Sequence, residues 1–122
     1  MAQSGLTIPS DVLQAFTSLK IERKFKYMII HVNEKNISYK TAETTATFSD
    51  FSREFDAKLA CYGIYDSESK KKLVLVHWNP NDAPVKNRML VSTTLKALQD
   101  SLHGLANAQQ VTDLTELKNA CL

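Results

Sequence analysis

One run of residues, Leu73-Val74-Leu75-Val76-His77-Trp78, is almost entirely apolar. This composition is typical of a strand that is buried on both faces of a sheet, and the run is far too short to span a membrane. The rest of the chain must therefore supply helices that cover both faces. With 122 residues, of which 43% are hydrophobic, the chain is long enough for one such domain, which we place at residues 1–122.

The other elements are predicted from the spacing of apolar residues and from turn signals. A first helix is expected from about residue 10, with Val12, Leu13, Phe16 and Leu19 on one face, and a second at residues 48–55, with Ser49-Asp50 as a cap. Two further helices are expected from residue 85 to near Gly104 and at residues 111–117. Strands are expected at residues 25–32, 37–40, 61–65 and 72–78. Neighbouring strands can pair as hairpins. The order α-β-β-α-β-β-α-α therefore predicts an α/β fold in which a central mixed sheet has helices on both faces.

Composition excludes several classes of function. A formal net charge of +2 is too small for a protein that coats nucleic acid. The two cysteines, Cys61 and Cys121, lie outside any zinc-ligand spacing, and the three glycines form no phosphate-binding loop. We therefore expect no metal, no cofactor and no nucleic-acid partner. The first residues lack the pattern of a signal peptide, so we expect a cytoplasmic protein. We also expect it to be monomeric.

No catalytic constellation emerges from the sequence. The three histidines, His31, His77 and His103, are separated by whole elements, which favours structural roles. Cys61 opens an apolar strand, where a buried thiol has a raised pKa and is not activated. The carboxylates Glu54 and Asp56 lie in a polar stretch and are interpreted as solvated. The sequence thus predicts a binding protein and not an enzyme.

The segment from Trp78 to Leu90 carries the clearest functional signal. Pro80 ends the strand and Pro84 suits the first turn of a helix. Lys86 and Arg88 then place two cations near the N-terminus of that helix, where they oppose the helix dipole. We interpret them as retained for an acidic partner; the alternative is that they are ordinary solvated surface residues.

The sequence resembles the ADF/cofilin family, that is, the actin-depolymerising-factor homology (ADF-H) domain. The resemblance runs through Ser4-Gly5, Ala15-Phe16, Leu19-Lys20, Lys24-Phe25-Lys26-Tyr27 and Tyr62-Gly63-Ile64-Tyr65-Asp66, and it culminates in Trp78-Asn79-Pro80 with Ala83-Pro84-Val85-Lys86-Asn87-Arg88-Met89. This last string is far more specific to the family than the Ser-Gly pair. The resemblance covers nearly the whole chain in order, and it implies the cofilin-like fold of a central mixed sheet flanked by helices.

The resemblance implies that the chain binds actin monomers and filaments, prefers actin that carries ADP, and promotes filament depolymerisation and turnover. It assigns the monomer contact to Ser4, Gly5, Lys86, Arg88, Met89 and Lys96, and the filament contact to Lys70, Lys71, Lys72, Glu116 and Lys118. Met89 would supply the apolar centre of the monomer contact. Ser4 resembles an inhibitory phosphorylation site, where added negative charge would satisfy Lys86 and Arg88 internally and repel an acidic partner.

Three departures from the family pattern change these expectations. Leu95 stands where the family has a lysine, and Gln99-Asp100 replaces a basic pair, so binding to phosphoinositides is expected to be weak; Lys96 compensates in part. The loop between Asp66 and Leu73 is short where many members project a longer hairpin. We therefore expect monomer binding to be intact, filament binding to be weakened and severing to be modest.

Two alternatives lie within the same fold. A relative of glia maturation factor would bind an actin-related-protein complex, and the Ser-Gly terminus with Lys86 and Arg88 argues against it. A coactosin-like protein would bind filaments only and would not need the string that ends at Met89.

Overall fold

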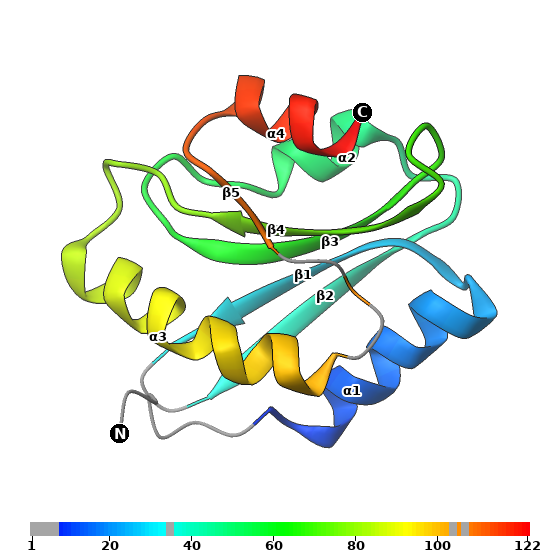
Figure 1. The fold of residues 1–122 in the computed structure, drawn as a ribbon, viewed down its shortest axis with the longest axis horizontal. Coiled ribbons are helices and arrows are strands. Elements are labelled where there is room, and N and C mark those ends of the chain that lie inside the picture. Colours follow the sequence, from blue (N-terminus) through cyan, green and yellow to red (C-terminus); the bar gives the residue numbers. More distant parts are fainter. Residues whose placement is uncertain (1–7, 34–35, 103–104, 106–107) are drawn as a thin grey trace.

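The computed structural model describes residues 8–33, 36–102, 105 and 108–122. Among these residues, five strands form one sheet in the order β2-β1-β3-β4-β5 (Figure 1). The strands are β1 (Phe25–Val32), β2 (Ile37–Glu43), β3 (Cys61–Ser67), β4 (Lys72–Trp78) and β5 (Gln109–Val111). The pairs β2–β1, β1–β3 and β3–β4 are antiparallel, and β5 pairs parallel to β4. The prediction of a mixed sheet is confirmed.

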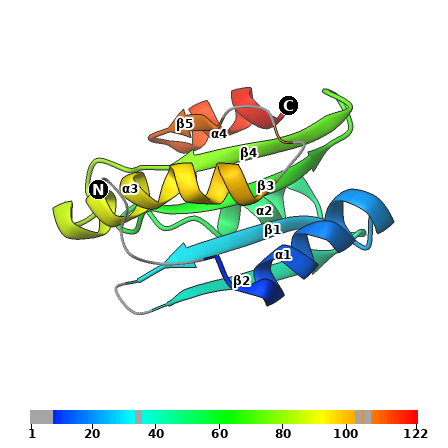
Figure 2. The same cartoon turned by 60° about the horizontal axis from the view of Figure 1, so that its bottom comes forward.

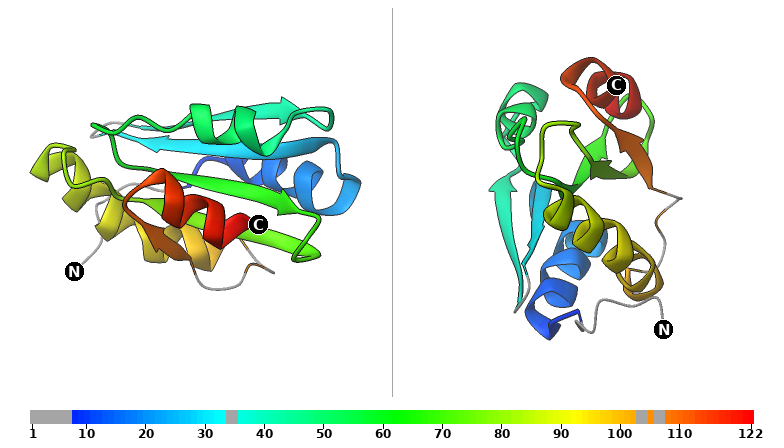
Figure 3. Two further views of the ribbon diagram at one scale, coloured as in Figure 1. Left: turned by 90° about the horizontal axis from the view of Figure 1, so that it is seen from above. Right: turned by 90° about the vertical axis from the view of Figure 1, so that its left-hand side faces the viewer.

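Helices cover both faces of this sheet, as predicted. The helices are α1 (Ser10–Thr17), η1 (Ser18–Glu22, a π-helix), α2 (Phe48–Arg53), α3 (Val85–Ser101) and α4 (Leu114–Cys121). α1 and α3 lie on one face, and α2 and α4 lie on the other (Figure 3). On the first face, α3 lies over the side of the sheet formed by β3 and β4, and α1 over the side formed by β1 and β2 (Figure 2).

The apolar run in β4 contributes to two separate cores, because successive side chains of a strand point to opposite faces. Leu73 and Leu75 pack in the core beneath α1 and α3. Val74, Val76 and Trp78 pack in the core beneath α2 and α4. β4 is therefore covered on both faces, and it has β3 on one edge and β5 on the other, as its composition predicted.

The predicted helix at residues 111–117 is wrong at its start. Val111 ends β5, where it pairs with Trp78 and is buried, and α4 begins only at Leu114. The carboxylate of Asp113 accepts a hydrogen bond from the Glu116 N–H at 2.8 Å and caps the helix. β5 was missed because three residues with one apolar side chain carry no periodicity, and its pairing depends on how α3 returns the chain to β4.

Other boundaries differ by a few residues. α1 passes into a π-helix at Ser18, α2 ends at Arg53 and not at residue 55, and α3 ends at Ser101. Thr47 caps α2, not Ser49, since its hydroxyl accepts from the Asp50 N–H while the Asp50 side chain accepts from the Thr47 N–H. β2 also continues through the polar residues to Glu43, because its pairing with β1 does not require apolar side chains at an exposed edge.

Three contacts fix the position of α3 on the sheet. The Asn87 Oδ1 accepts from the Ala60 N–H at 2.7 Å, and the Asn87 Nδ2 donates to the Ala60 carbonyl at 3.3 Å. Further along the helix, the buried Tyr62 hydroxyl donates to the Val91 carbonyl. The first two turns of α3 are thus tied to β3 and the segment before it, which gives the exposed side of the helix a defined orientation.

Candidate functional site

The exposed side of α3 brings together most of the predicted monomer-binding residues that the structure describes. Lys86, Met89 and Lys96 lie three and seven residues apart, which places them along one stripe of a helix, and all three are exposed. Met89 is 62% exposed and Val85 is 71% exposed. Two large apolar side chains one helical turn apart are therefore open to a partner. Ser4 and Gly5 lie outside the described residues.

The N-terminus of α3 adds positive potential to this surface. Its N-cap residue, Pro84, makes no capping hydrogen bond through its side chain, and the first turn contains no acidic residue. The first N–H groups of a helix lack intrahelical partners and carry the positive end of the helix dipole. Together with Lys86 and Arg88 they favour a partner that carries carboxylates.

Arg88 is held in place by a hydrogen bond within the protein. Its Nε donates to the Asn79 Oδ1 at 2.8 Å, and the side chain of Arg88 is partly buried. A hollow of about 340 Å³ lies beside it, lined by Asn79, Val85, Arg88, Met89, Ser92 and Thr93. The sequence predicted Arg88 as a surface cation for a partner, and the structure adds that Arg88 lines a hollow together with the exposed apolar side chains of Val85 and Met89.

Lys96 lies further along α3 and is more loosely held. Its Nζ is 3.9 Å from a carboxylate oxygen of Asp100, and both side chains are largely exposed. Exposed ion pairs of this kind contribute little to stability. Lys96 can therefore exchange Asp100 for a partner's carboxylate at low cost.

The predicted filament-binding residues do not form one cluster. Lys70, Lys71 and Lys72 are exposed at the turn between β3 and β4, and Lys118 is exposed on α4. The turn is attached to the C-terminal end of α4, because the Ser67 hydroxyl donates to the Cys121 carbonyl and the Ser69 hydroxyl donates to the Leu122 carbonyl. The lysines of the turn thus lie beside the last turn of α4.

Glu116, by contrast, belongs to the first turn of α4. Its Oε1 accepts from both the N–H and the hydroxyl of Thr112 at 2.7 Å. These bonds stabilise the connection between β5 and α4. Glu116 is therefore placed apart from the lysines of the β3–β4 turn, with which the sequence grouped it.

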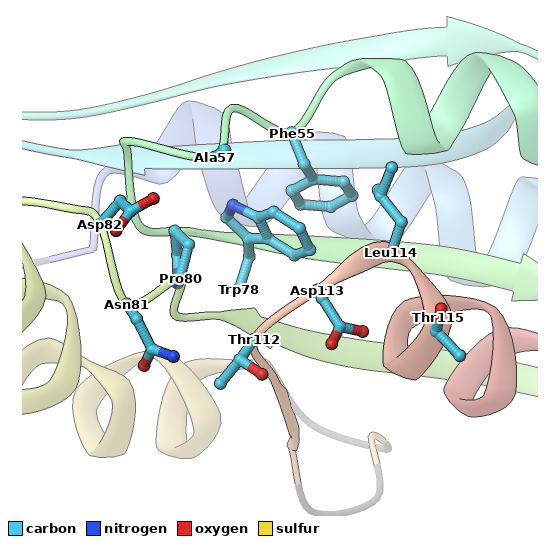
Figure 4. A pocket seen from close by; sticks show the side chains of 10 residues that line it. All are labelled: Phe55, Ala57, Trp78, Pro80, Asn81, Asp82, Thr112, Asp113, Leu114 and Thr115. Atoms are coloured by element: carbon cyan, nitrogen blue, oxygen red, sulfur yellow. The ribbon is translucent and has the colours of Figure 1, made fainter.

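A larger cavity of about 610 Å³ lies on the opposite side of the β4–α3 loop, between that loop and the start of α4 (Figure 4). Trp78 and Phe55 line it, with ring centroids 5.1 Å apart, and the Trp78 Nε1 donates to the Asp56 carbonyl at 2.8 Å. Asp82 and Asp113 also line this cavity, and the Asp113 carboxylate is the cap of α4. Trp78 is 3% exposed, so its role in the Trp78–Met89 string is to hold the loop and not to contact a partner.

The two cysteine thiols, outside the α3 surface, are buried in the protein core. Burial raises the pKa of the thiols of Cys61 and Cys121 to about 12, which leaves both protonated and unreactive at neutral pH. Among the described residues, no group of three His, Cys, Asp or Glu side chains could hold a metal ion. Within the same ranges, no helix has the length and apolar character needed to cross a membrane.

The interpretation of Glu54 as a solvated carboxylate is wrong. The Tyr27 hydroxyl donates to its Oε2 at 2.7 Å, and the Lys40 Nζ lies 3.0 Å from its Oε1. These two hydrogen bonds lower the pKa of Glu54 against the opposing effect of burial, and burial with the Glu54 contact raises the pKa of Tyr27. Glu54, Tyr27 and Lys40 together link the end of α2 to β1 and β2. The sequence could not indicate this contact, because the three residues lie on separate elements.

Comparison with known proteins decides the family. Residues 5–122 match the family model described as cofilin/tropomyosin-type actin-binding protein. The chain belongs to this family. A cofilin from Mycosarcoma maydis is 32% identical over 123 residues, covering 93% of this chain and 88% of that protein. An actin-depolymerizing factor 2 from Oryza sativa is 28% identical over 126 residues, covering 95% of this chain and 87% of that protein.

The fold agrees with this membership. The crystal structure of Streptomyces griseoflavus cofilin matches with a TM-score of 0.84 at 27% identity, covering 93% of this chain and 92% of that one. The resemblance seen in the sequence and the cofilin-like fold expected from it are both confirmed. Sequence reasoning missed Val85 and Asn79 as parts of the α3 surface. The exposure of Val85 depends on how the helix is rotated on the sheet, and the Asn79 contact depends on the path of the loop.

Proposed function

We propose that this ADF/cofilin-family chain binds the actin monomer through the first turns of α3 and promotes the depolymerisation and turnover of actin filaments. One observation carries the proposal: Val85 and Met89 are exposed one turn apart, beside Lys86 and Arg88, at a helix N-terminus without a side-chain cap. This arrangement offers an apolar centre with a cationic edge, and the family to which the chain belongs is one of actin-binding proteins. Ser4 and Gly5 complete the surface in this proposal.

The proposed division of labour follows from the chemistry of each side chain. Met89 is flexible and apolar, so it adapts to an apolar groove on the partner. Lys86 and Arg88 pair with carboxylates at the edge of that groove, where charge complementarity mainly sets specificity and the rate of association. Lys96 extends the contact along the helix. The protein acts by binding, preferentially to actin that carries ADP, and not as an enzyme.

Filament binding is proposed to be weaker than monomer binding. Lys70, Lys71 and Lys72 provide positive charge on a short turn, and Lys118 adds to it from α4. A short turn limits reach toward a second actin subunit, so stable decoration and severing are modest. Glu116 is left out of this contact, since both of its hydrogen bonds to Thr112 serve the start of α4.

Two regulatory properties belong to the same proposal. Phosphoinositides bind weakly, because Leu95 and Gln99 offer no charge where basic residues would be needed along α3. Phosphorylation of Ser4, where it occurs, adds about −1.5 to −2 charge to a residue that the proposal assigns to the actin contact, and so opposes binding of an acidic partner. We place the protein with the cytoskeleton in the cytoplasm.

The proposal is tested by binding of the double variant Lys86→Ala/Arg88→Ala to monomeric ADP-actin. We expect affinity to fall by roughly tenfold or more, because two charge pairs at one interface are lost together. The matched control is Lys24→Ala/Arg53→Ala, which removes the same net charge from exposed positions outside α3, in the η1–β1 connection and on α2. Thermal unfolding of all variants checks that each remains folded. Equal affinities for wild type and the α3 variant would contradict the assignment of this surface.

Cosedimentation with actin filaments separates the proposed activity from its alternatives. We expect actin to move to the supernatant while little of this protein pellets. Pelleting in proportion to actin, with no release of actin, would instead indicate a coactosin-like filament binder. Absence of any effect on actin, together with binding to an actin-related-protein complex, would indicate the glia-maturation-factor-like alternative.

A further inference from the structure

The contact between Asn79 and Arg88 joins the end of β4 to the first turn of α3. The Arg88 Nε donates to the Asn79 Oδ1 at 2.8 Å across nine positions of the chain. Asn79 is 7% exposed, so this amide is buried although it lies in a loop. The contact itself is partly buried. A hydrogen bond from a charged donor is among the stronger polar contacts in proteins.

The backbone around Asn79 is itself held in place. The Asn79 N–H donates to the Val111 carbonyl at 2.9 Å, which extends the pairing of β4 with β5 by one residue. Pro80 follows, and a residue that precedes proline is restricted to extended conformations. The acceptor of the Arg88 contact is therefore attached to a rigid part of the sheet and not to a loose loop.

This contact determines where the guanidinium group lies. The five N–H donors of arginine are fixed in one plane, so an acceptor at Nε sets the direction of the two terminal nitrogens. Asn79 and Arg88 both line the hollow of about 340 Å³ beside Val85 and Met89. The charge is thus held next to the exposed apolar side chains, where a flexible arginine would otherwise sample several rotamers.

We propose that Asn79 is a positioning residue for partner binding: it fixes the Arg88 guanidinium at the wall of this hollow, ready to pair with a carboxylate that flanks an apolar side chain of the partner. The inference rests on the proposed function, since it takes actin as the partner. Pre-orientation of a side chain raises affinity because the entropy of ordering it is not lost on binding. The residue acts through Arg88 and does not itself need to touch the partner.

A double-mutant cycle with monomeric ADP-actin tests the proposal. The proteins are wild type, Asn79→Ala, Arg88→Ala and the double variant, with affinity and unfolding free energy measured for each. We expect Asn79→Ala to weaken binding about fivefold in the wild-type background and to have no effect in the Arg88→Ala background. A purely structural role for Asn79 would lower affinity equally in both backgrounds.

The matched control is Asn81→Ala, an exposed asparagine in the same loop. We expect its affinity to equal that of the wild type, and a loss equal to that of Asn79→Ala would overturn the proposal. The two levels of inference fail differently. Unchanged affinity for Arg88→Ala contradicts the proposed α3 site itself, whereas a clear loss for Arg88→Ala with additive or absent effects of Asn79→Ala contradicts only the role of Asn79.

Discussion

At the scale of single residues, Gly63 shows how little space the core beneath α2 leaves. A Cβ added there would lie 2.7 Å from the Phe55 Cζ and 2.8 Å from the Phe51 Cζ. The Phe51 ring cannot easily move away, since it packs against Phe55 and Tyr65 with ring centroids 4.9 Å apart in both cases. The glycine is therefore required by the close approach of aromatic rings to β3.

Gly63→Ala is expected to lower the free energy of unfolding by about 1–3 kcal/mol, because overpacking forces side chains from their preferred rotamers. Urea unfolding of the variant measures the effect. The comparison variant is Phe55→Leu, alone and combined with Gly63→Ala. Since leucine vacates the space near position 63, the combined loss should be smaller than the sum of the two single losses. Full additivity would show that the ring of Phe55 is not the obstacle.

The residue scale also marks the limit of what the sequence predicts about the site. Lys86 and Arg88 could be singled out because a local string with two prolines places them at a helix start, and Met89 because the same string resembles the ADF/cofilin family. The role of Asn79 could not, since it depends on a side-chain contact across a turn whose path is set by β5. Local patterns predict which residues share a helix face, while contacts between elements need the fold.

At the scale of elements, the sequence predicts the strands and helices that have strong apolar periodicity. It does not predict the elements that form only because they pair or pack with another part of the chain. β1, β4 and α3 are long enough for their spacing to be unambiguous. β5 is three residues long and exists because its backbone pairs with β4. The π-helix after α1 likewise has no signal in the sequence, since its residues continue the helical spacing of α1.

The attachment of α3 to Ala60, the residue directly before β3, gives a prediction at this scale. Asn87→Ala removes both hydrogen bonds to Ala60 and leaves the buried N–H of Ala60 without its acceptor. We expect the free energy of unfolding to fall by about 1–3 kcal/mol. Asn119→Ala on α4 is the control, because it brings the same gain in helix propensity at an exposed position. Equal stability of the two variants would show that the Ala60 contact contributes nothing.

At the scale of the whole molecule, the two cores on either side of the sheet differ in the side chains that form and border them. The core beneath α2 and α4 is rich in aromatic rings, whereas the core beneath α1 and α3 borders the buried polar groups His77 and Thr94. His77 is 3% exposed, and its Nε2 has no hydrogen-bond partner among the described residues. This buried site can accommodate a neutral imidazole, whereas a charged imidazole without a partner would be strongly unfavourable there.

Burial, followed by the charge of Arg88, lowers the pKa of His77 from its ordinary value of 6.5. Near pH 6.5 and below, the imidazole of His77 therefore binds a proton more readily in the unfolded chain than in the folded protein. The free energy of unfolding must then fall as the pH drops below about 6.5. The loss from one such group is at most about 1.4 kcal/mol between pH 7.5 and 5.5. Above pH 7.5 the group is neutral in both states and has no effect.

Urea unfolding at several pH values between 5.5 and 7.5 measures this dependence, with His77→Gln as the variant that cannot titrate. We expect the slope of unfolding free energy against pH to be reduced in that variant. His31→Gln is the comparison, because His31 is only partly buried and the nearby Glu54 carboxylate opposes the lowering of its pKa. An unchanged slope in His77→Gln would mean that the folded protein accommodates the charged imidazole, which the burial of His77 and the repulsion from the charge of Arg88 argue against.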